Sequence, residues 1–233
     1  MSRVLAFDFG ASTGRAILAE YNGEKIEYNE IHRFDNVLCE QNGMLCWDFD
    51  YLLGEVKKAI SLAENADSLA FDTWGVDYGM LDKDGNLVSK PVCYRDDRTK
   101  GMTDKIYQSV SPSKLYAKTG NQIMPINTLF QLTADGTDNA EMFLFMPDLF
   151  AYSLCGAKSV DKTIASTSQM LDLENVEWQK DIFALSGKNE KILPPIVNCA
   201  TVVGEYNGIK VIKVAGHDTQ LSLIHISEPT RLD

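Results

Sequence analysis

Hydrophobic and polar residues follow a pattern along the chain that is typical of an α/β domain. Short apolar runs at residues 3–9, 15–21 and 25–33 predict three strands. Asn22 and Gly23 separate the second run from the third and predict a tight hairpin, because both residue types tolerate positive φ. The chain therefore opens as an antiparallel meander with a glycine-bearing loop after its first strand.

The rest of the chain alternates between predicted helices and strands. A stripe of apolar residues predicts a helix over 51–64, which Asp48 or Asp50 can cap. Buried strands are predicted over 68–74 and 209–215. Between them we expect a hairpin over 78–88, mostly helical structure over 101–155 with breaks at Pro112 and Pro125, and helices over 146–154 and around 178–185. The order β-β-β-α-β-α-β with helical insertions predicts one α/β domain with a mixed sheet.

The composition fits a folded protein and narrows its partners. Of the 233 residues, 45% are hydrophobic and 24% are charged, which is ordinary for a soluble globular domain. The 22 basic and 33 acidic residues give a formal net charge of −11, so we expect no nucleic-acid partner. A single nucleotide can still bind, because a phosphate loop uses local backbone N–H groups.

Cysteine usage and hydropathy predict a cytoplasmic protein. The five cysteines are an odd number without a C-x-x-C pair or metal-ligand spacing, so we expect reduced thiols. No signal peptide precedes the first apolar run, and no run approaches the roughly 18 residues that cross a bilayer. We therefore expect no membrane partner.

The loop after the first predicted strand, residues 8–15 (DFGASTGR), could bind phosphate. Its two glycines and two small hydroxyl residues let the backbone turn tightly and aim N–H groups at an anion, and Arg15 adds donors. Asp8 could hold a hydrated Mg²⁺ beside the phosphates. The segment lacks the lysine of the Walker pattern and the spacing of the dinucleotide fingerprint. A plain glycine-bearing hairpin with a solvated aspartate is the alternative.

Two further polar segments could line a sugar pocket. Residues 72–77 (DTWGVD) offer the flat apolar face of a tryptophan surrounded by polar groups. Taken alone, a core tryptophan followed by a turn glycine explains this pattern better. Residues 94–99 (YRDDRT) could supply bidentate donors to a polyol, and solvated loop charge explains them almost as well.

A carboxylate follows the last predicted strand, in residues 216–219 (GHDT). Asp218 comes at the carboxyl end of a buried strand, where α/β proteins place ligands. It could accept the proton of an alcohol during phosphoryl transfer. His217 could hydrogen-bond the substrate, although a structural role for this histidine is the more common alternative.

The order of these segments resembles that of the FGGY carbohydrate kinases and, within that family, of the rhamnulokinases. The likeness covers residues 3–219, and it extends to residues 31–34, 41–43, 47–48, 127–129, 131–132 and 146–148. The DTWGVD segment is the most family-specific part. The resemblance implies an actin-like, ribonuclease H-like domain with a mixed, five-stranded sheet, the first of two domains that hold ATP and a sugar between them.

The resemblance also implies roles for individual residues. The ATP phosphates would contact Ala11, Ser12, Thr13, Gly14 and Arg15, and Mg²⁺ would lie near Asp8. The sugar would contact Trp74, Gly75, His217, Asp218 and Thr219. Asp218 would accept the proton when the phosphoryl group of ATP is transferred to the C1 hydroxyl of a ketose, L-rhamnulose.

The end of the chain departs from the family. Residues 220–233 (QLSLIHISEPTRLD) look like translated sequencing-adaptor read-through, so we expect a native N-terminal domain over 1–219 and a non-native tail over 220–233. The C-terminal kinase domain would then be absent. We expect the fragment to be inactive, because phosphoryl transfer depends on positioning by both halves of the cleft.

Other functions stay open on the sequence alone. A kinase for fuculose, xylulose or another polyol would share these motifs, because pocket details decide the substrate. A noncatalytic actin-like nucleotide-binding module would have no need of the DTWGVD segment. A stand-alone sugar-binding domain would bind a ketose without nucleotide.

Overall fold

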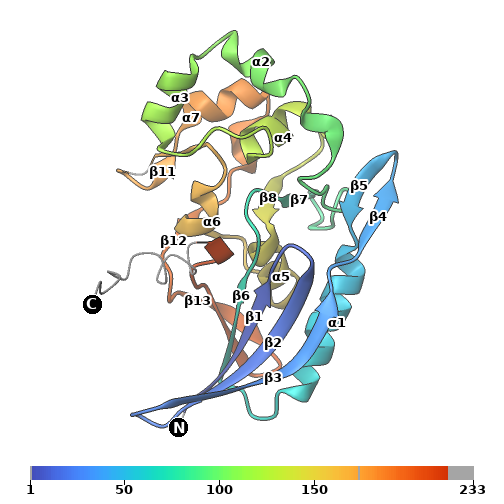
Figure 1. The fold of residues 1–233 in the computed structure, drawn as a ribbon, viewed down its shortest axis with the longest axis vertical. Helices are drawn as coiled ribbons and strands as arrows, with labels where there is room; N and C mark the ends of the chain where they lie inside the picture. The colour runs from blue at the N-terminus through green and yellow to red at the C-terminus, as the bar shows by residue number, and fades with distance from the viewer. Residues whose placement is uncertain (1, 173, 220–233) are drawn as a thin grey trace, which may run out of the picture.

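The computed structural model describes residues 2–172 and 174–219, and the expected tail over 220–233 lies outside them. Within these residues the chain forms a lower part built on a twisted sheet and an upper part made mostly of short helices (Figure 1). The sheet has the strand order β13-β14-β6-β1-β2-β3. Its strands are β1 (Ser2–Phe9), β2 (Thr13–Tyr21), β3 (Ile26–Asp35), β6 (Ser68–Asp72), β13 (Val202–Tyr206) and β14 (Ile209–Ile212).

The sheet is mixed, as the sequence predicts. β1 pairs with β2, and β2 with β3, in antiparallel register, while β1, β6 and β14 run parallel. One strand more than expected is present in the described part, because β13 pairs with β14 across a hairpin. β13 escapes prediction because it is short, interrupted by Gly204 and only partly buried.

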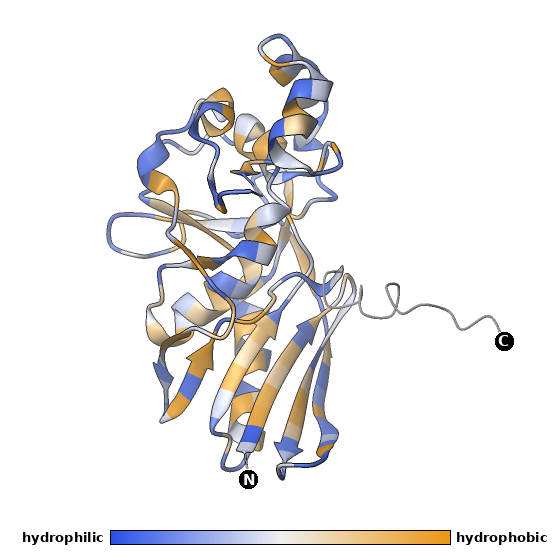
Figure 2. Cartoon of the chain, turned by 90° about the vertical axis from the view of Figure 1, so that its left-hand side faces the viewer, coloured by the Kyte–Doolittle hydropathy of each residue, from blue (hydrophilic) through white to orange (hydrophobic). Residues whose placement is uncertain are grey.

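Two helices cover one face of the sheet. α1 (Phe49–Leu62) and α5 (Met146–Cys155) agree closely with the predicted helices. Their rings stack with those of the sheet: Phe150 lies 4.7 Å from Phe9, 5.1 Å from Phe49 and 5.5 Å from Phe71, measured between centroids. Phe7 adds a stacked contact with Phe71 at 4.9 Å. These aromatic side chains form the centre of the core, and Figure 2 shows the hydrophobic residues running along the sheet strands.

The helical part inserts between β6 and β13. It contains α2 (Met102–Tyr107), α3 (Pro112–Thr119), α4 (Thr128–Ala134), α6 (Lys162–Ser166) and α7 (Lys180–Phe183). Single turns of 3-10 helix lie at Asp97–Thr99, Ala184–Ser186 and Glu190–Ile192. Pro112 begins a helix rather than only breaking one, because proline fits the first turn, where its missing N–H costs nothing.

The described residues also form four short two-stranded sheets outside the main sheet. They pair β4 (Leu38–Gln41) with β5 (Met44–Trp47), β7 (Tyr78–Leu81) with β8 (Met142–Phe145), β9 (Val160–Asp161) with β12 (Ile196–Val197), and β10 (Leu171–Asp172) with β11 (Glu177–Trp178). The sequence predicts β7 in a hairpin with residues 87–88, but the structure retains only a bridge between Leu81 and Leu87 there, and β8 is the main partner. β8 is an apolar run inside a region that we expected to be helical.

Two further expectations need correction. The residue before α1 is Asp48, but its side chain makes no capping hydrogen bond and instead accepts from Lys90 Nζ at 2.5 Å. The helix expected around 178–185 begins only at Lys180, because Trp178 belongs to β11. Among the described residues, none of the helices has the length and apolar character needed to span a bilayer.

Candidate active site

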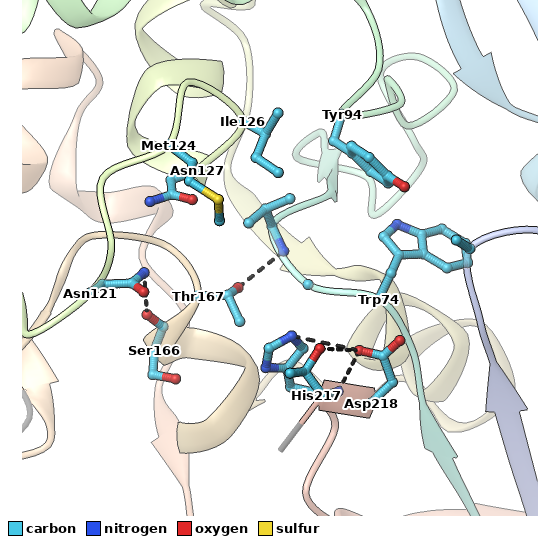
Figure 3. A pocket seen from close by; sticks show the side chains of 14 residues that line it. Trp74, Tyr94, Asn121, Met124, Ile126, Asn127, Ser166, Thr167, His217 and Asp218 are labelled. Atoms are coloured by element: carbon cyan, nitrogen blue, oxygen red, sulfur yellow. Dashed lines mark hydrogen bonds and ion pairs between the residues drawn. The ribbon is translucent and has the colours of Figure 1, made fainter. Parts of the chain in front are cut away.

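A pocket of about 440 Å³ lies between the carboxyl end of the sheet and the helical part (Figure 3). The residues that line it come from six separate segments: Ala11; Trp74, Gly75 and Val76; Tyr94; Asn121, Met124, Ile126 and Asn127; Ser166 and Thr167; and His217, Asp218 and Thr219. In Figure 3, Trp74 and Tyr94 stand across the pocket from Asn121 and Ser166, with His217 and Asp218 at its base. The pocket is large enough for a small sugar.

The wall of the pocket that follows β6 is a strained turn. The backbone N–H of Asp77 donates to the carbonyl of Gly75 at 2.9 Å, and Val76 between them has a φ of 68°. This is the geometry of the rare γ-turn with positive φ, which a β-branched residue adopts at a cost of roughly 1–3 kcal/mol. Thr167 Oγ1 accepts from the Val76 N–H at 3.0 Å, and Thr128 Oγ1 donates to the Val76 carbonyl at 2.8 Å. Two helical elements therefore hold the turn in place.

Gly75 has no room for a side chain. A Cβ atom there would lie 2.9 Å from Thr167 Cγ2 and 3.2 Å from His217 Nε2. Its backbone therefore lies bare on the pocket wall, with Trp74 beside it. The Trp74 side chain is only 5% exposed, and its indole packs at 4.2 Å between centroids on Trp47. The aromatic surface offered to a ligand is rigid.

Asp218 lies at the base of the pocket because the chain pairs again with the end of β6. Thr73 N–H donates to the Gly216 carbonyl, and Asp218 N–H donates to the Thr73 carbonyl, both at 3.0 Å. The backbone N–H of Thr219 donates to Asp218 Oδ1 at 2.6 Å, and His217 Nε2 lies 3.6 Å from the same oxygen. Burial lowers the pKa of His217, so the imidazole is neutral at pH 7.

The predicted phosphate loop lies at the edge of this pocket. Of its residues, Ala11 lines the pocket, whereas Ser12, Thr13, Gly14 and Arg15 do not. The loop is closed by the Gly10 N–H, which donates to the Thr13 carbonyl at 3.0 Å, and by Asn36 Nδ2, which donates to the Gly10 carbonyl at 2.7 Å.

Arg15 and Asp8 pair with each other. The β1–β2 register places these residues opposite one another, and the guanidinium of Arg15 donates to Asp8 Oδ2 from Nε at 2.7 Å and from Nη2 at 2.5 Å. The guanidinium of Arg15 is therefore already paired with the carboxylate of Asp8. The sequence did not predict this pair, although the hairpin register contains it.

Three carboxylates gather at the ends of β1, β6 and the segment after β14. Asp72 is the register partner of Asp8, and burial together with the charges of Asp8 and Asp218 raises the pKa of Asp72 to about 8. A cation at this place would offset the accumulated negative charge. In the described part of the chain, no three His, Cys, Asp or Glu side chains are near enough to enclose a metal ion by themselves. The donor set fits Mg²⁺ that arrives with nucleotide phosphates, which needs only one or two carboxylates.

Some lining residues carried no signal in the sequence. Asn121, Met124, Ser166 and Thr167 belong to the helical part and occur in no recognisable motif. Asn127 occurs in one of the segments that carry the family resemblance, which is the signal that could have found it. Of the charged segment 94–99, only Tyr94 lines the pocket.

The charged side chains that follow Tyr94 do not line the pocket and bond to other parts of the chain. Arg98 donates to Gln131 Oε1 at 2.7 Å, and Asp96 accepts from the backbone N–H of Leu45 at 2.8 Å. Arg95 reaches back to the Ala11 carbonyl at 3.4 Å. The sequence predicts polyol donors throughout this segment, but only Tyr94 lines the pocket.

A model of the N-terminal domain of the FGGY family of carbohydrate kinases matches residues 3–226. The chain belongs to this family. Its fold is similar to that of xylulose kinase from Lactobacillus acidophilus, with a TM-score of 0.82 and 16% sequence identity over 97% of this chain. It is also similar to gluconate kinase from the same organism (TM-score 0.81, 16% identity, 95% of this chain) and to Plasmodium falciparum glycerol kinase with ADP (TM-score 0.78, 14% identity, 96% of this chain).

These comparisons confirm the α/β, actin-like fold expected for an FGGY kinase. They place the chain in the family without singling out the rhamnulokinases. The chain spans about half the length of the similar structures, covering 50%, 49% and 51% of the three proteins named.

Proposed function

We propose that this FGGY domain is part of a kinase that transfers the γ-phosphoryl group of ATP to the C1 hydroxyl of a ketose, with L-rhamnulose as the substrate and rhamnulose 1-phosphate and ADP as the products. The observation that carries the proposal is the pocket itself. It brings the carboxylate of Asp218, the bare backbone of Gly75 and the aromatic face of Trp74 to one cavity, next to Ala11 of the first loop.

Each group has a chemical task in this proposal. Asp218 accepts the proton of the C1 hydroxyl as its oxygen attacks the γ-phosphorus. Trp74 and the Gly75 backbone orient the sugar, and neutral His217 hydrogen-bonds one of its hydroxyl groups. The segment Ala11 to Arg15 contacts the phosphate oxygens of ATP, with Ala11 and Ser12 offering backbone N–H groups that lie outside β2.

Mg²⁺ would be held at Asp8, with Asp72 close by. When bound, the ion would neutralise phosphate charge that develops during transfer. Arg15, which pairs with Asp8, would lie beside the same phosphates.

We propose that residues 1–219 form the N-terminal domain of a two-domain kinase and that a C-terminal domain completes the cleft. The length of the similar structures, about twice that of this chain, supports this division. The 233-residue chain alone then lacks turnover, since half a cleft does not position the two substrates. A C-terminal domain would also exclude water when the cleft closes.

Two alternatives concern the substrate and the activity. Xylulose and fuculose kinases would use the same pocket chemistry, and xylulose kinase is among the similar structures. An actin-like module that binds nucleotide without phosphorylating a sugar would leave the Trp74 face without a ligand.

The deciding experiment is a coupled ADP-release assay on the full-length protein with L-rhamnulose, L-fuculose, D-xylulose and glycerol. We expect ATP consumption that depends on a ketose and is greatest with L-rhamnulose. If D-xylulose is preferred, the proposed substrate is wrong, but ATP-dependent phosphorylation of a ketose still stands. ADP release at the same rate without any ketose or polyol would overturn the kinase proposal.

A further inference from the structure

Asp77 is a buried charged group that no step above uses. It is 1% exposed, and its carboxylate accepts four hydrogen bonds. Oδ2 accepts from the indole N–H of Trp47 at 2.7 Å, the indole N–H of Trp74 at 3.0 Å and the backbone N–H of Tyr94 at 3.1 Å. Oδ1 accepts from the Gln131 amide at 3.0 Å. Each of these four donors is an uncharged group.

These donors belong to four segments that are distant in sequence. Trp47 ends β5, Trp74 follows β6, Tyr94 lies before the 3-10 turn at Asp97–Thr99, and Gln131 lies in α4. Trp74 and Tyr94 both line the pocket. One carboxylate therefore fixes the two aromatic residues on this side of the pocket, one through its side chain and the other through its backbone.

The arrangement requires an acceptor with two oxygen atoms. An ionised carboxylate accepts all four hydrogen bonds, and hydrogen bonds to a charged acceptor are stronger than neutral ones. Protonation turns one oxygen into an O–H donor that faces other donors, so at least one of the four bonds is lost. Gln131 cannot turn its amide to compensate, because its Oε1 accepts from Arg98 and its Nε2 also donates to the Ile126 carbonyl at 2.8 Å.

We propose that Asp77 is a positioning residue of the sugar pocket, whose ionised carboxylate holds Trp74 and Tyr94 in the geometry that receives the ketose. The ligand named here rests on the proposed function. The hydrogen-bond network does not, so the two can be tested separately.

The network also predicts the pH at which the pocket loosens. Burial raises the pKa of Asp77 to about 6, against the lowering effect of its four donors. The other titratable or charged groups near Asp77 are Tyr78, Cys93, Arg95 and Arg98. Burial raises the pKa of Tyr78 and raises that of Cys93 to about 12, and arginine side chains stay charged. Asp77 is therefore the group of this set that titrates between pH 5 and 7.

The first test is an NMR titration of the indole N–H resonances of the 233-residue chain, which contains three tryptophans. We expect the resonances of Trp47 and Trp74 to shift together with a midpoint near pH 6. Trp178 is an internal control, because its indole N–H donates to the Pro194 carbonyl at 2.7 Å, and its resonance should stay constant. Trp47→Phe and Trp74→Phe assign the resonances, and Asp77→Asn should abolish both shifts.

The second test uses the full-length protein with L-rhamnulose and D-xylulose as probes. Asp77→Asn should raise the KM for the ketose about tenfold, the loss expected for one charge-assisted hydrogen bond, and change kcat less than threefold. The wild-type KM should rise below pH 6 in parallel with the tryptophan shifts. Asp67→Asn is the control, because Asp67 accepts from the backbone N–H of Arg3 at 2.7 Å, at the end of β6 opposite the pocket.

Two results would overturn the inference. One is a wild-type titration in which the indole resonances of Trp47 and Trp74 do not shift near pH 6. This test uses the wild-type chain alone, so it does not depend on whether Asp77→Asn folds. The other is a shift of Trp74 alone, which points to His217 in the same pocket instead. Joint shifts of Trp47 and Trp74 without binding of either ketose would support the positioning role and refute the proposed substrate class.

Discussion

The backbone of Gly75 and Val76 forms one wall of the candidate sugar site. Val76 adopts a φ of 68°, and a Cβ atom added at Gly75 would come too close to Thr167 and His217. Strain of this kind persists where surrounding structure fixes it, and it often occurs at binding sites. Here the hydrogen bonds of Thr167 and Thr128 to Val76 supply that constraint.

Gly75→Ala tests this geometry. The new methyl group would lie 2.9 Å from Thr167 Cγ2, so the turn or Thr167 must move. We expect the KM for the ketose to rise at least tenfold in the full-length protein, and the free energy of unfolding to fall by about 1–3 kcal/mol. Steady-state kinetics and urea denaturation measure the two effects.

Gly54→Ala is the control for that substitution. Gly54 lies in α1 with no atom within 4 Å of an added Cβ. Alanine should stabilise the helix by about 0.5–1 kcal/mol and leave the ketose KM unchanged. Equal ketose KM values for Gly75→Ala and wild type would show that the backbone of Gly75 does not contact the sugar.

At the level of secondary-structure elements, a buried ion pair joins the segment after β14 to helix α5. Lys213 follows β14, Asp148 lies in the first turn of α5, and both side chains are almost fully buried. Lys213 Nζ donates to Asp148 Oδ1, while Asp148 Oδ2 has no hydrogen-bond partner among the residues that the structure describes. The segment held by this pair continues directly to His217 and Asp218, so the pair helps to place the proposed base.

Lys213→Met should destabilise the domain in a pH-dependent way. Burial raises the pKa of Asp148 to about 7, although Lys213 lowers it, and removal of the lysine raises it further. The unfolded chain ionises Asp148 near its ordinary pKa of 3.8, so the stability of the folded state falls as the pH rises from about 4 through 7. We expect a loss of about 3 kcal/mol at pH 8 and a smaller loss at pH 5, measured by urea denaturation.

The double variant Asp148→Asn/Lys213→Met is the matched control. It removes both charges and should lie within about 1 kcal/mol of wild type at either pH. A single Lys213→Met variant as stable as wild type at pH 8 would contradict the role given to the ion pair.

The sequence predicts some elements well, and the reasons for its failures are physical. Periodicity identifies β1, α1 and α5, because each buries an apolar face, and the Asn22-Gly23 turn signal helps to identify β2 and β3, which are more exposed. The sequence predicts helix where β8 lies, because four apolar residues in a row fit either structure, and only pairing with β7 decides between them. β13 is short and partly exposed, so its place in the sheet depends on the hairpin with β14.

The residues of the candidate site also fall into those that the sequence predicts and those that it does not. Residues in local motifs, such as Trp74 and Asp218, could be proposed from the sequence because residue type and position at a strand end suggest a task. Asn121 and Thr167 could not, since they reach the pocket through the packing of the helical part. The strained turn was also hidden, because nothing in the sequence distinguishes a valine with positive φ.

The whole molecule presents a site that opens at one end of the sheet. The loop with Ala11, the turn with Gly75 and the segment with Asp218 come from β1, β6 and the end of β14, which are parallel neighbours. Their carboxyl ends meet at one edge, where α/β proteins bind ligands. The similar kinase structures have about twice the length of this chain.

We propose Asp218 as the catalytic base of a ketose kinase. The most direct measurement compares wild type and Asp218→Asn in the full-length protein, with ketose-dependent ADP release as one readout and ATP affinity by calorimetry as the other. We expect phosphorylation to fall by about 10²–10⁴-fold, the usual contribution of general base catalysis, with ATP affinity within about twofold of wild type. Ketose-dependent turnover of Asp218→Asn close to that of wild type would show that Asp218 is not the catalytic base.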